Sequence, residues 1–343
     1  MRSRVIGGEF ELTGVPEVLS KDFGYYSYAS GRTALYQILM SIKLETFKVW
    51  LPDWLCESMI DAVRRSGISY SFYTLGRNLE MDVDQFVQRN RPVSEHDVIV
   101  LVNYFGLINV ERTIKQLKDY RVDSIIIEDD VQALFSFMDD EHHLADYRFT
   151  SLRKSIACPD GGLVFTKRIM PRVSAMNTFA PLKLKASLVK GGATEEGDDE
   201  EYLRPFEEGE ARIEENYNSV MSSEAAQILS AIDLQKASDI RKNNAQYLVK
   251  ELFNLGVEPL VPIDPAKTPL FVPIAVENRD ELRRELRRNQ IFCPVHWPLR
   301  DDMRGLPMGQ YMAEHELSLV VDQRYGLEDM QAIVEIMKNY ICK

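Results

Sequence analysis

Few residues of this sequence could build a metal or disulfide site. It has four cysteines, which are widely spaced and form no C-x-x-C pair: Cys56, Cys158, Cys293 and Cys342. We therefore expect reduced thiols in a cytoplasmic protein. Histidine is also scarce, and no histidine stands at ligand spacing from the acids described below. His142 and His143 are expected in a solvated turn, so the sequence predicts no bound metal.

Long hydrophobic runs and an excess of basic charge are absent as well. No apolar run approaches the roughly 20 residues of a membrane-spanning helix, and MRSRVIGGEFELTG at the start has no apolar core of a secretory signal. The formal net charge is −12, of which residues 195–215 carry −9 through eleven acids and two arginines. We expect neither nucleic acid nor a membrane as a partner, because nucleic-acid binding needs a basic stripe. The acidic run 195–215 is expected to be a solvated loop and helix face, with a role in substrate exclusion or partner docking as the alternative.

The sequence does contain alternating apolar strands and amphipathic helices. Strands are predicted at 48–54, 69–75, 97–106, 124–130 and 161–167. Helices are predicted between them, at 29–42, 57–67, 81–90 and 109–120. This order favours right-handed β-α-β units in an α/β fold, with a mostly parallel sheet between helices.

The C-terminal part of the chain has a different pattern. A long helical region is predicted over about 207–255, followed over 269–340 by a strand, a helix, a short strand and a final helix. This pattern indicates a smaller α+β domain. The predicted organisation is an N-terminal arm over 1–20, a large domain over 21–235 that includes the acidic segment, and a small domain over 236–343.

Three features of the large domain could carry chemistry. ASGRTAL (29–35) is a glycine turn that opens a helix, whose free N–H groups suit a phosphate, although Ser30 as a plain N-cap explains it too. The strand SIIIEDD ends in three acids, which either pair with basic side chains or place one of them, Asp129, against a cationic group of a ligand. Lys154 is either a solvated turn lysine or a nucleophile assisted by the neighbouring charge of Arg153. In this order the three features are what pyridoxal phosphate (PLP) needs for its phosphate, its ring nitrogen and its aldehyde.

Over nearly its whole length the sequence resembles the DegT/DnrJ/EryC1/StrS family of PLP-dependent sugar aminotransferases, which have the type I aminotransferase fold. The most specific match is IIIEDDVQAL, which is similar to the family's E-D-A-A-Q-A. Further segments resemble the family in the same order: ASGRTALYQIL, VWLPDWLCESMIDAV, FYTLGRNLEMDVDQF, VIVLVNYFG, NYNSVMSSEAAQIL and RDELRRELRRNQIFCPVHWP. The resemblance implies transfer of an amino group from an amino acid, expected to be glutamate, to a keto-sugar. That acceptor is expected to be nucleotide-linked and to serve polysaccharide biosynthesis.

The resemblance also implies roles for individual residues. Lys154 forms the Schiff base with the cofactor, and Asp129 keeps the pyridine nitrogen protonated. Gln132 contacts the phenolic oxygen, and Trp54 stacks on the ring. The implied phosphate contacts are Gly31, Arg32, Thr33 and Ser151. Asn218 matches an asparagine that reaches the cofactor phosphate of the neighbouring subunit, which implies a homodimer.

Some positions depart from the family pattern. Ser151 stands three residues before Lys154, whereas the family has S-F-x-x-x-K; P-D-G-G replaces G-E-G-G, and Val220 replaces an arginine. These positions lie where substrate specificity is partly built. A PLP enzyme acting on another small carbonyl compound or amino acid, and a non-catalytic PLP-binding relative, therefore stay open as alternatives. His296 is expected either to face the substrate or to be a satisfied structural histidine.

Overall fold

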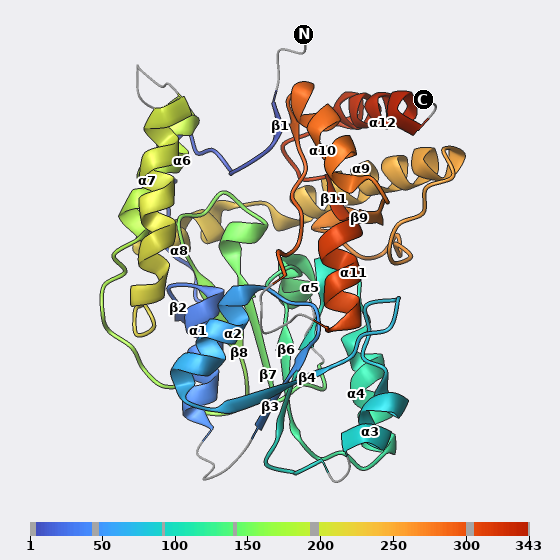
Figure 1. Cartoon of the computed structure of the whole chain (residues 1–343). Coiled ribbons are helices and arrows are strands. Elements are labelled where there is room, and N and C mark those ends of the chain that lie inside the picture. The colour runs from blue at the N-terminus through green and yellow to red at the C-terminus, as the bar shows by residue number, and fades with distance from the viewer. Residues whose placement is uncertain are drawn as a thin grey trace.

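A computed structural model describes residues 5–42, 48–90, 93–139, 143–192, 199–299 and 305–341. Its larger part is built on a seven-stranded sheet with the order β2-β8-β7-β6-β5-β3-β4 (Figure 1). Strands β7, β6, β5, β3 and β4 run parallel, β8 is antiparallel to β7, and β2 is antiparallel to β8. The predicted α/β class with a mostly parallel mixed sheet is therefore confirmed. Part of the predicted arm (1–4), part of the acidic segment (195–198), His142 and Cys342 lie outside the described residues.

Five strands of the sheet, β3, β4, β5, β6 and β8, lie within the strands predicted from the sequence, whereas β2 and β7 were not predicted. The strands of the sheet are β2 (Tyr26–Tyr28), β3 (Lys48–Pro52), β4 (Ser69–Tyr73), β5 (Val98–Val102), β6 (Ile125–Asp129), β7 (Tyr147–Ser151) and β8 (Gly162–Phe165). Every residue of β5, β6 and β7 is buried, because parallel strands are covered by helices on both faces. The last residues of these three strands are therefore shielded from bulk water.

Helices and 3-10 turns connect and cover the strands. The helices are α1 (Gly31–Ser41), α2 (Glu57–Ser66), α3 (Val83–Asn90), α4 (Val110–Asp119), α5 (Leu134–Asp139), α6 (Ala180–Lys190), α7 (Asp199–Arg212) and α8 (Ser223–Ala231). The 3-10 turns are η1 (Tyr104–Gly106), η2 (Leu152–Lys154) and η3 (Ile213–Glu215). Helix α1 contacts α2, β7 and β8, whereas α5 contacts β7. Helix α2 ends at Gly67 in a left-handed conformation with φ 78°, which glycine adopts without strain.

The predicted helical region over about 207–255 is interrupted. Between η3 and α8 the chain is not helical, and Ser219 forms an isolated bridge with Ala175. The side chain of Asn216 holds this crossing, since it accepts from the N–H of Thr178 and donates to the carbonyl oxygen of Arg212. Helix propensity alone could not predict this break, because the competing hydrogen bonds come from another part of the chain.

The C-terminal elements form a second core. They are α9 (Leu234–Asn254), β9 (Phe271–Ala275), α10 (Arg279–Arg288), β10 (Ile291–Phe292), α11 (Pro307–His315), β11 (Glu316–Val320) and α12 (Leu327–Ile341). Strands β9 and β11 pair antiparallel, and β10 pairs in parallel with β1 (Ile6–Gly7). The fully buried Ile6 therefore brings the N-terminal segment into this core. The predicted domain boundary at residue 235 stays a prediction.

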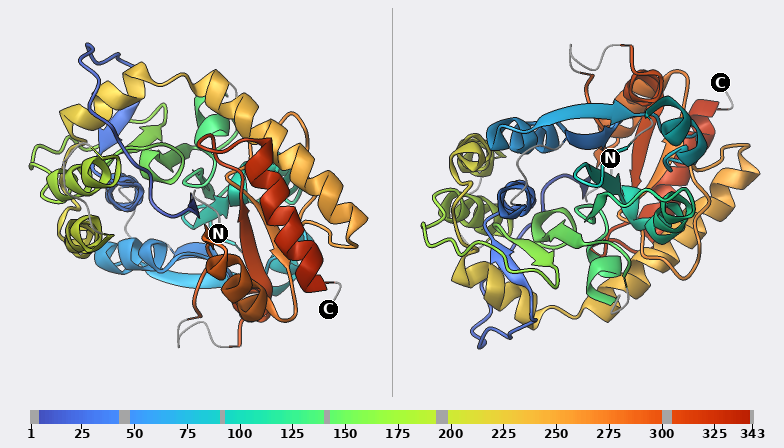
Figure 2. Two further views of the ribbon diagram at one scale, coloured as in Figure 1. Left: turned by 90° about the horizontal axis from the view of Figure 1, so that it is seen from above. Right: turned by 90° about the horizontal axis from the view of Figure 1, so that it is seen from below.

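Two groups of helices flank the molecule on opposite sides. Seen from above, α9 and α12 lie side by side on one side, and the α6–α7 pair lies on the other (Figure 2). Among the helices that the structure describes, none is long and apolar enough to cross a membrane.

Candidate active site

The side chains that the sequence singled out meet at the carboxyl edge of the sheet. Asp129 is the last residue of β6 and lies in register with Phe149 of β7. Strand β7 ends at Ser151, and the turn η2 that follows carries Lys154. Helix α1 begins against this edge, because a Cβ on Gly31 would lie 3.3 Å from the Cβ of Ser151. All five residues line one cavity of about 160 Å³. We call it the cofactor cavity.

Two of the three acids at the end of β6 have a cation of their own. Arg148 Nη2 lies 2.8 Å from Asp130 Oδ2, and Arg148 Nε lies 3.4 Å from Glu128 Oε2. All three side chains are almost fully buried on the face of the sheet that bears α5, where Arg148 also donates to the carbonyl oxygen of Ser136. Pairing with a basic side chain, one of the two alternatives for these acids, therefore holds for Glu128 and Asp130.

Asp129 points to the opposite face, because side chains alternate along a strand. Its Oδ1 accepts the backbone N–H of Val131 at 2.8 Å, and within the described ranges no basic side chain forms an ion pair with it. Burial raises the pKa of Asp129 to about 7, and the positive charge of Lys154 acts in the opposite sense. The cavity thus contains a buried carboxyl group that lacks a close cation, which a pyridinium nitrogen would supply.

The amide of Gln132 is oriented by the backbone. Its Oε1 accepts the N–H of Phe105 at 3.1 Å, and the side chain lines the cofactor cavity. Because the oxygen is engaged, the NH₂ group is the part of the amide left to donate. That is the donor that a phenolate oxygen requires, so the position of Gln132 fits the role implied by the resemblance.

The N-terminus of α1 supplies donors for an anion. Ser30 is the N-cap, and its Oγ accepts the N–H of Thr33 at 3.1 Å. Arg32 lines the cofactor cavity, and its buried Nε and Nη1 have no hydrogen-bond partner. Arg32 Nη1 lies 3.4 Å from Glu214 Oε1, but that carboxylate is mostly exposed. Orphaned guanidinium donors beside a helix N-terminus fit a phosphate group.

Three of the predicted contacts do not line this cavity. Thr33 is buried, its N–H is taken by Ser30, and its hydroxyl donates to the carbonyl oxygen of Asn216. Trp54 lies in the core, where its ring stacks on Tyr104 at 4.9 Å. Asn218 is exposed, and its Oδ1 accepts from Gln37. Its predicted role towards a second subunit stays a prediction.

Besides Phe149, the aromatic ring that lines the cofactor cavity is that of Trp297, which the sequence reasoning missed. Trp54 and Trp297 pack against each other with ring centroids 5.0 Å apart. The indole N–H of Trp54 donates to the carbonyl oxygen of His296 at 3.2 Å, which turns Trp54 away from the cavity. The available signal was CPVHWP, where Trp297 directly follows the histidine singled out by the resemblance.

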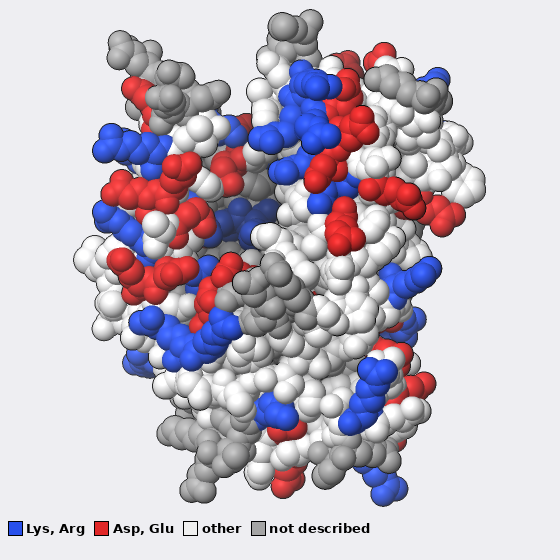
Figure 3. Space-filling view, in the orientation of Figure 1, with Lys and Arg blue, Asp and Glu red and all other residues white. Residues whose placement is uncertain are grey.

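A larger cavity of about 540 Å³ adjoins the first and is visible as a hollow between α7 and α10 (Figure 3). Arg153, Lys154 and Glu210 line both cavities, so the exposed Lys154 stands where they meet. His296 also lines the larger cavity, and its Nδ1 lies 3.0 Å from the hydroxyl of Ser318. Both alternatives for His296 are therefore compatible with its position.

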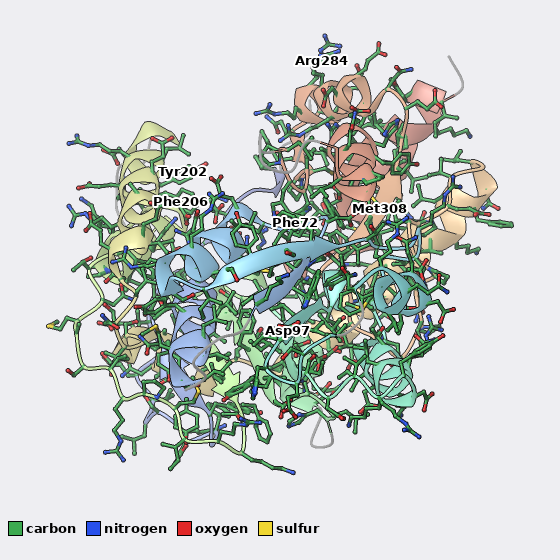
Figure 4. The ribbon with its side chains drawn as sticks, turned by 60° about the horizontal axis from the view of Figure 1, so that its bottom comes forward. Phe72, Asp97, Tyr202, Phe206, Arg284 and Met308 are labelled. Atoms are coloured by element: carbon green, nitrogen blue, oxygen red, sulfur yellow. The ribbon has the colours of Figure 1, made fainter. Side chains whose placement is uncertain are left out.

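Glu210 corrects the expectation that the acidic segment is only a solvated face. It lies on α7, one turn after Phe206 (labelled in Figure 4), and its Oε1 is 2.6 Å from Arg153 Nη1. The same oxygen contacts Nζ of the buried Lys183. Burial acts to raise the pKa of Glu210, but Arg153 and Lys183 together lower it to about 2. An ionised carboxylate thus neutralises the cation next to Lys154.

The described part of the chain has no group of three or more histidine, cysteine or acidic side chains that could hold a metal ion. No family model and no curated protein sequence matches the chain.

Solved structures do match it. A DegT/DnrJ/EryC1/StrS aminotransferase from Brucella abortus is similar with a TM-score of 0.68 and 18% identity, over 93% of this chain and 86% of that chain. A sugar aminotransferase from Streptococcus pneumoniae in its PLP form gives 0.69 and 16%, over 92% and 86%. DesI, in the presence of its TDP-sugar product, gives 0.64 and 18%, over 92% and 80%. At these identities the likeness establishes the fold, and the chain has the type I fold that its sequence resemblance predicted.

Proposed function

We propose that this protein is a PLP-dependent aminotransferase that moves an amino group from an amino acid, expected to be glutamate, to a nucleotide-linked keto-sugar. The observation that carries the proposal is the buried Asp129, which forms no ion pair with any described basic side chain and lines the same cavity as Lys154. A carboxyl group in that position is unfavourable by itself. It becomes favourable when a cationic ring nitrogen binds against it.

The residues present fit the cofactor. Asp129 would hold the ring nitrogen and Gln132 the phenolic oxygen, while the start of α1 with Arg32 and the side chain of Ser151 would hold the phosphate. Lys154 would bond to the aldehyde. When bound, PLP supplies the electron sink for the bonds that break at the amino carbon.

The remaining chemistry belongs to the side chains of this protein. Lys154 Nζ would take the proton from the α carbon of the donor and return it, acting as general base and then acid. Its place at the junction of the two cavities lets it reach the cofactor on one side and the substrate on the other. The apolar side chains of Leu55, Met59 and Trp297 line the cofactor cavity and limit the access of water.

The fold likeness supports the finer parts of the proposal. The sugar aminotransferases with the same fold include one solved in the presence of a TDP-sugar product. A nucleotide-linked acceptor, polysaccharide biosynthesis in the cytoplasm and a homodimer completed by Asn218 are proposed on this basis. The exposed side chain of Asn218 is free to lie at a subunit interface.

The test begins with the purified protein and PLP. We expect a visible absorbance band that borohydride reduction removes, with the label mapped to Lys154 by mass spectrometry. Lys154→Ala should abolish turnover, whereas Lys167→Ala, at an exposed site, should not. Steady-state transamination by the Lys154→Ala protein, or a label on another lysine, would contradict the assignment.

A half-reaction separates the proposal from a non-catalytic PLP-binding protein. Adding glutamate to the PLP form should change its spectrum to that of the amine form. A silent spectrum with glutamate and with other amino acids would favour the binding protein. A panel of nucleotide-linked keto-sugars and simple keto acids then identifies the acceptor, because only a substrate converts the amine form back.

A further inference from the structure

One wall of the larger cavity is the face of α10 that carries Arg283 and Arg287. These residues are four positions apart and therefore lie on the same side of the helix. In Figure 3 basic side chains gather along the edge of α10 beside the hollow. The other two arginines of the repeated pair, Arg284 and Arg288, do not line the cavity. Arg284 points outward at the end of the molecule (Figure 4).

Among the described residues, the two cavity-facing arginines have no acidic partner. Arg283 Nε donates to the carbonyl oxygen of Cys293 at 3.2 Å, and the guanidinium of Arg287 lies 5.9 Å from the ring centre of Phe292. In the ranges that the structure resolves into described residues, neither forms an ion pair. By contrast, Arg288 on the other face pairs with Glu285 at 3.1 Å. The charge of the inner pair is therefore available to a ligand.

Three acids line the same cavity; two of them are paired with cations, and the third, the exposed Glu9, lies on the N-terminal segment and not on α10. Asp322 binds Arg324 at 2.9 Å, and Glu210 binds Arg153 at 2.6 Å. Arg241 is fully buried there and donates to carbonyl oxygens of Ser155 and Leu270. These pairs leave a positive wall on α10, which suits an anion with several oxygens, because guanidinium groups bind phosphates in bidentate fashion.

An aromatic surface lies beside the two arginines. Phe292 is 38% exposed and lines the same cavity, held in place by the pairing of β10 with β1. Gly7 of β1 approaches so closely that a Cβ there would lie 2.2 Å from the carbonyl oxygen of Phe292. A flat ring next to phosphate-binding arginines is a surface on which a nucleobase can stack.

From this arrangement we infer that Arg283 and Arg287 bind the diphosphate of a nucleotide-linked acceptor, with Phe292 against its base. The sugar then extends from α10 towards Lys154, which lines the same cavity. The inference rests on the proposed function for the reaction at the sugar, but the anion site itself can be measured without any turnover. It identifies α10, outside the motifs of the cofactor site, as the element that selects the acceptor.

The test compares two double variants of the PLP-loaded protein. Arg283→Ala with Arg287→Ala removes the inner pair, and Arg284→Ala with Arg288→Ala removes the same charge from the outer face of the same helix. Calorimetric titration uses inorganic pyrophosphate and thymidine diphosphate as probes. Loss of the inner pair should weaken the binding of both probes by at least about tenfold, as expected for the loss of charged hydrogen bonds. Loss of the outer pair should weaken it by less than twofold. Phe292→Ala should weaken the binding of thymidine diphosphate and leave the binding of pyrophosphate unchanged.

Kinetics then separate this inference from the proposed function. The inner-pair variant should raise KM for a nucleotide-linked keto-sugar, with the glutamate half-reaction unchanged. Equal losses of probe binding in the two double variants would contradict the proposed anion site, since they would reflect only the overall charge of the protein. Unchanged pyrophosphate binding would overturn it even in an active enzyme. Conversely, if pyrophosphate binds through the inner pair but no amino transfer is found, the anion site stands and the proposed function is refuted. Because Arg283 also holds Cys293, Arg287→Ala alone, at an exposed position, is the fallback variant, with an expected loss in the same direction.

Discussion

Replacing Asp129 with asparagine should stabilise the cofactor-free protein while weakening its response to PLP. The ordinary pKa of an aspartate is 3.8, and burial raises that of Asp129 to about 7. Between these values the folded protein holds a proton that the unfolded chain has released. The free energy of unfolding therefore falls as the pH rises from about 4 to about 7. At 1.36 kcal/mol per pH unit, the ionised group destabilises the fold by at most about 4 kcal/mol above pH 7.

Asparagine keeps the shape of the side chain and can still accept the N–H of Val131, but it cannot ionise. We expect urea unfolding of the cofactor-free proteins to show an advantage of Asp129→Asn that is clearly smaller at pH 5 than at pH 8, because only part of the loss has occurred at pH 5. Adding PLP should reverse the order, because only the carboxylate gains from a cationic ring nitrogen. The change of this stability difference between pH 5 and pH 8 reports on Asp129 alone, because both proteins contain the other buried acids.

Asp130→Asn is the matched control, because it changes the adjacent acid in the same way. Asp130 is ion-paired with Arg148 at 2.8 Å, so its loss should destabilise the protein instead. Stability differences of the same sign for the two variants would refute the reasoning. So would an Asp129→Asn difference that is the same at pH 5 and pH 8.

Three further predictions concern the surroundings of the site. Glu210→Gln should leave Arg153 without its carboxylate and lower, by roughly one pH unit, the pH at which the spectrum of the bound cofactor changes; an unchanged absorbance titration would contradict this. Gly162→Ala should lower the free energy of unfolding by about 1–3 kcal/mol, because the new Cβ would lie 2.2 Å from the carbonyl oxygen of Ser30, while Gly326→Ala, with open space around it, should be nearly neutral in the same urea assay. Arg148→Met should lower the free energy of unfolding by about 3–5 kcal/mol, and by more at pH 8 than at pH 5, since it leaves two buried carboxyl groups without a cation. Equal losses at both pH values would count against that explanation.

The sequence predicted those parts of the site that depend on strand order. Asp129 ends the strand predicted over 124–130, so the rule for parallel sheets places it at the carboxyl edge. The strand that ends at Ser151 was not predicted, and only the family resemblance brought Ser151 and Lys154 to the same site. The residue-level roles remain predictions.

The parts that could not be predicted depend on contacts between distant segments. Whether Trp54 or Trp297 faces the cavity is decided by a hydrogen bond from Trp54 to His296, 242 positions away. The inward turn of Glu210 is likewise hidden by an acidic composition that is typical of a solvated face. A weak signal existed, since Phe206 and Glu210 are four residues apart and therefore share a side of α7.

The departures from the family pattern now have a structural explanation, which moves the question of specificity elsewhere. In P-D-G-G, Asp160 accepts hydrogen bonds from Ser222 and Asn177, and Gly162 permits the close approach to Ser30. None of the described residues of this turn lines either cavity, and neither does Val220. Asp160 and Gly162 therefore contribute to the scaffold around the start of α1, away from the lining of the larger cavity. Because that cavity is lined by residues of α10, β10 and the N-terminal segment, the proposed acceptor site draws on residues that the cofactor motifs do not include.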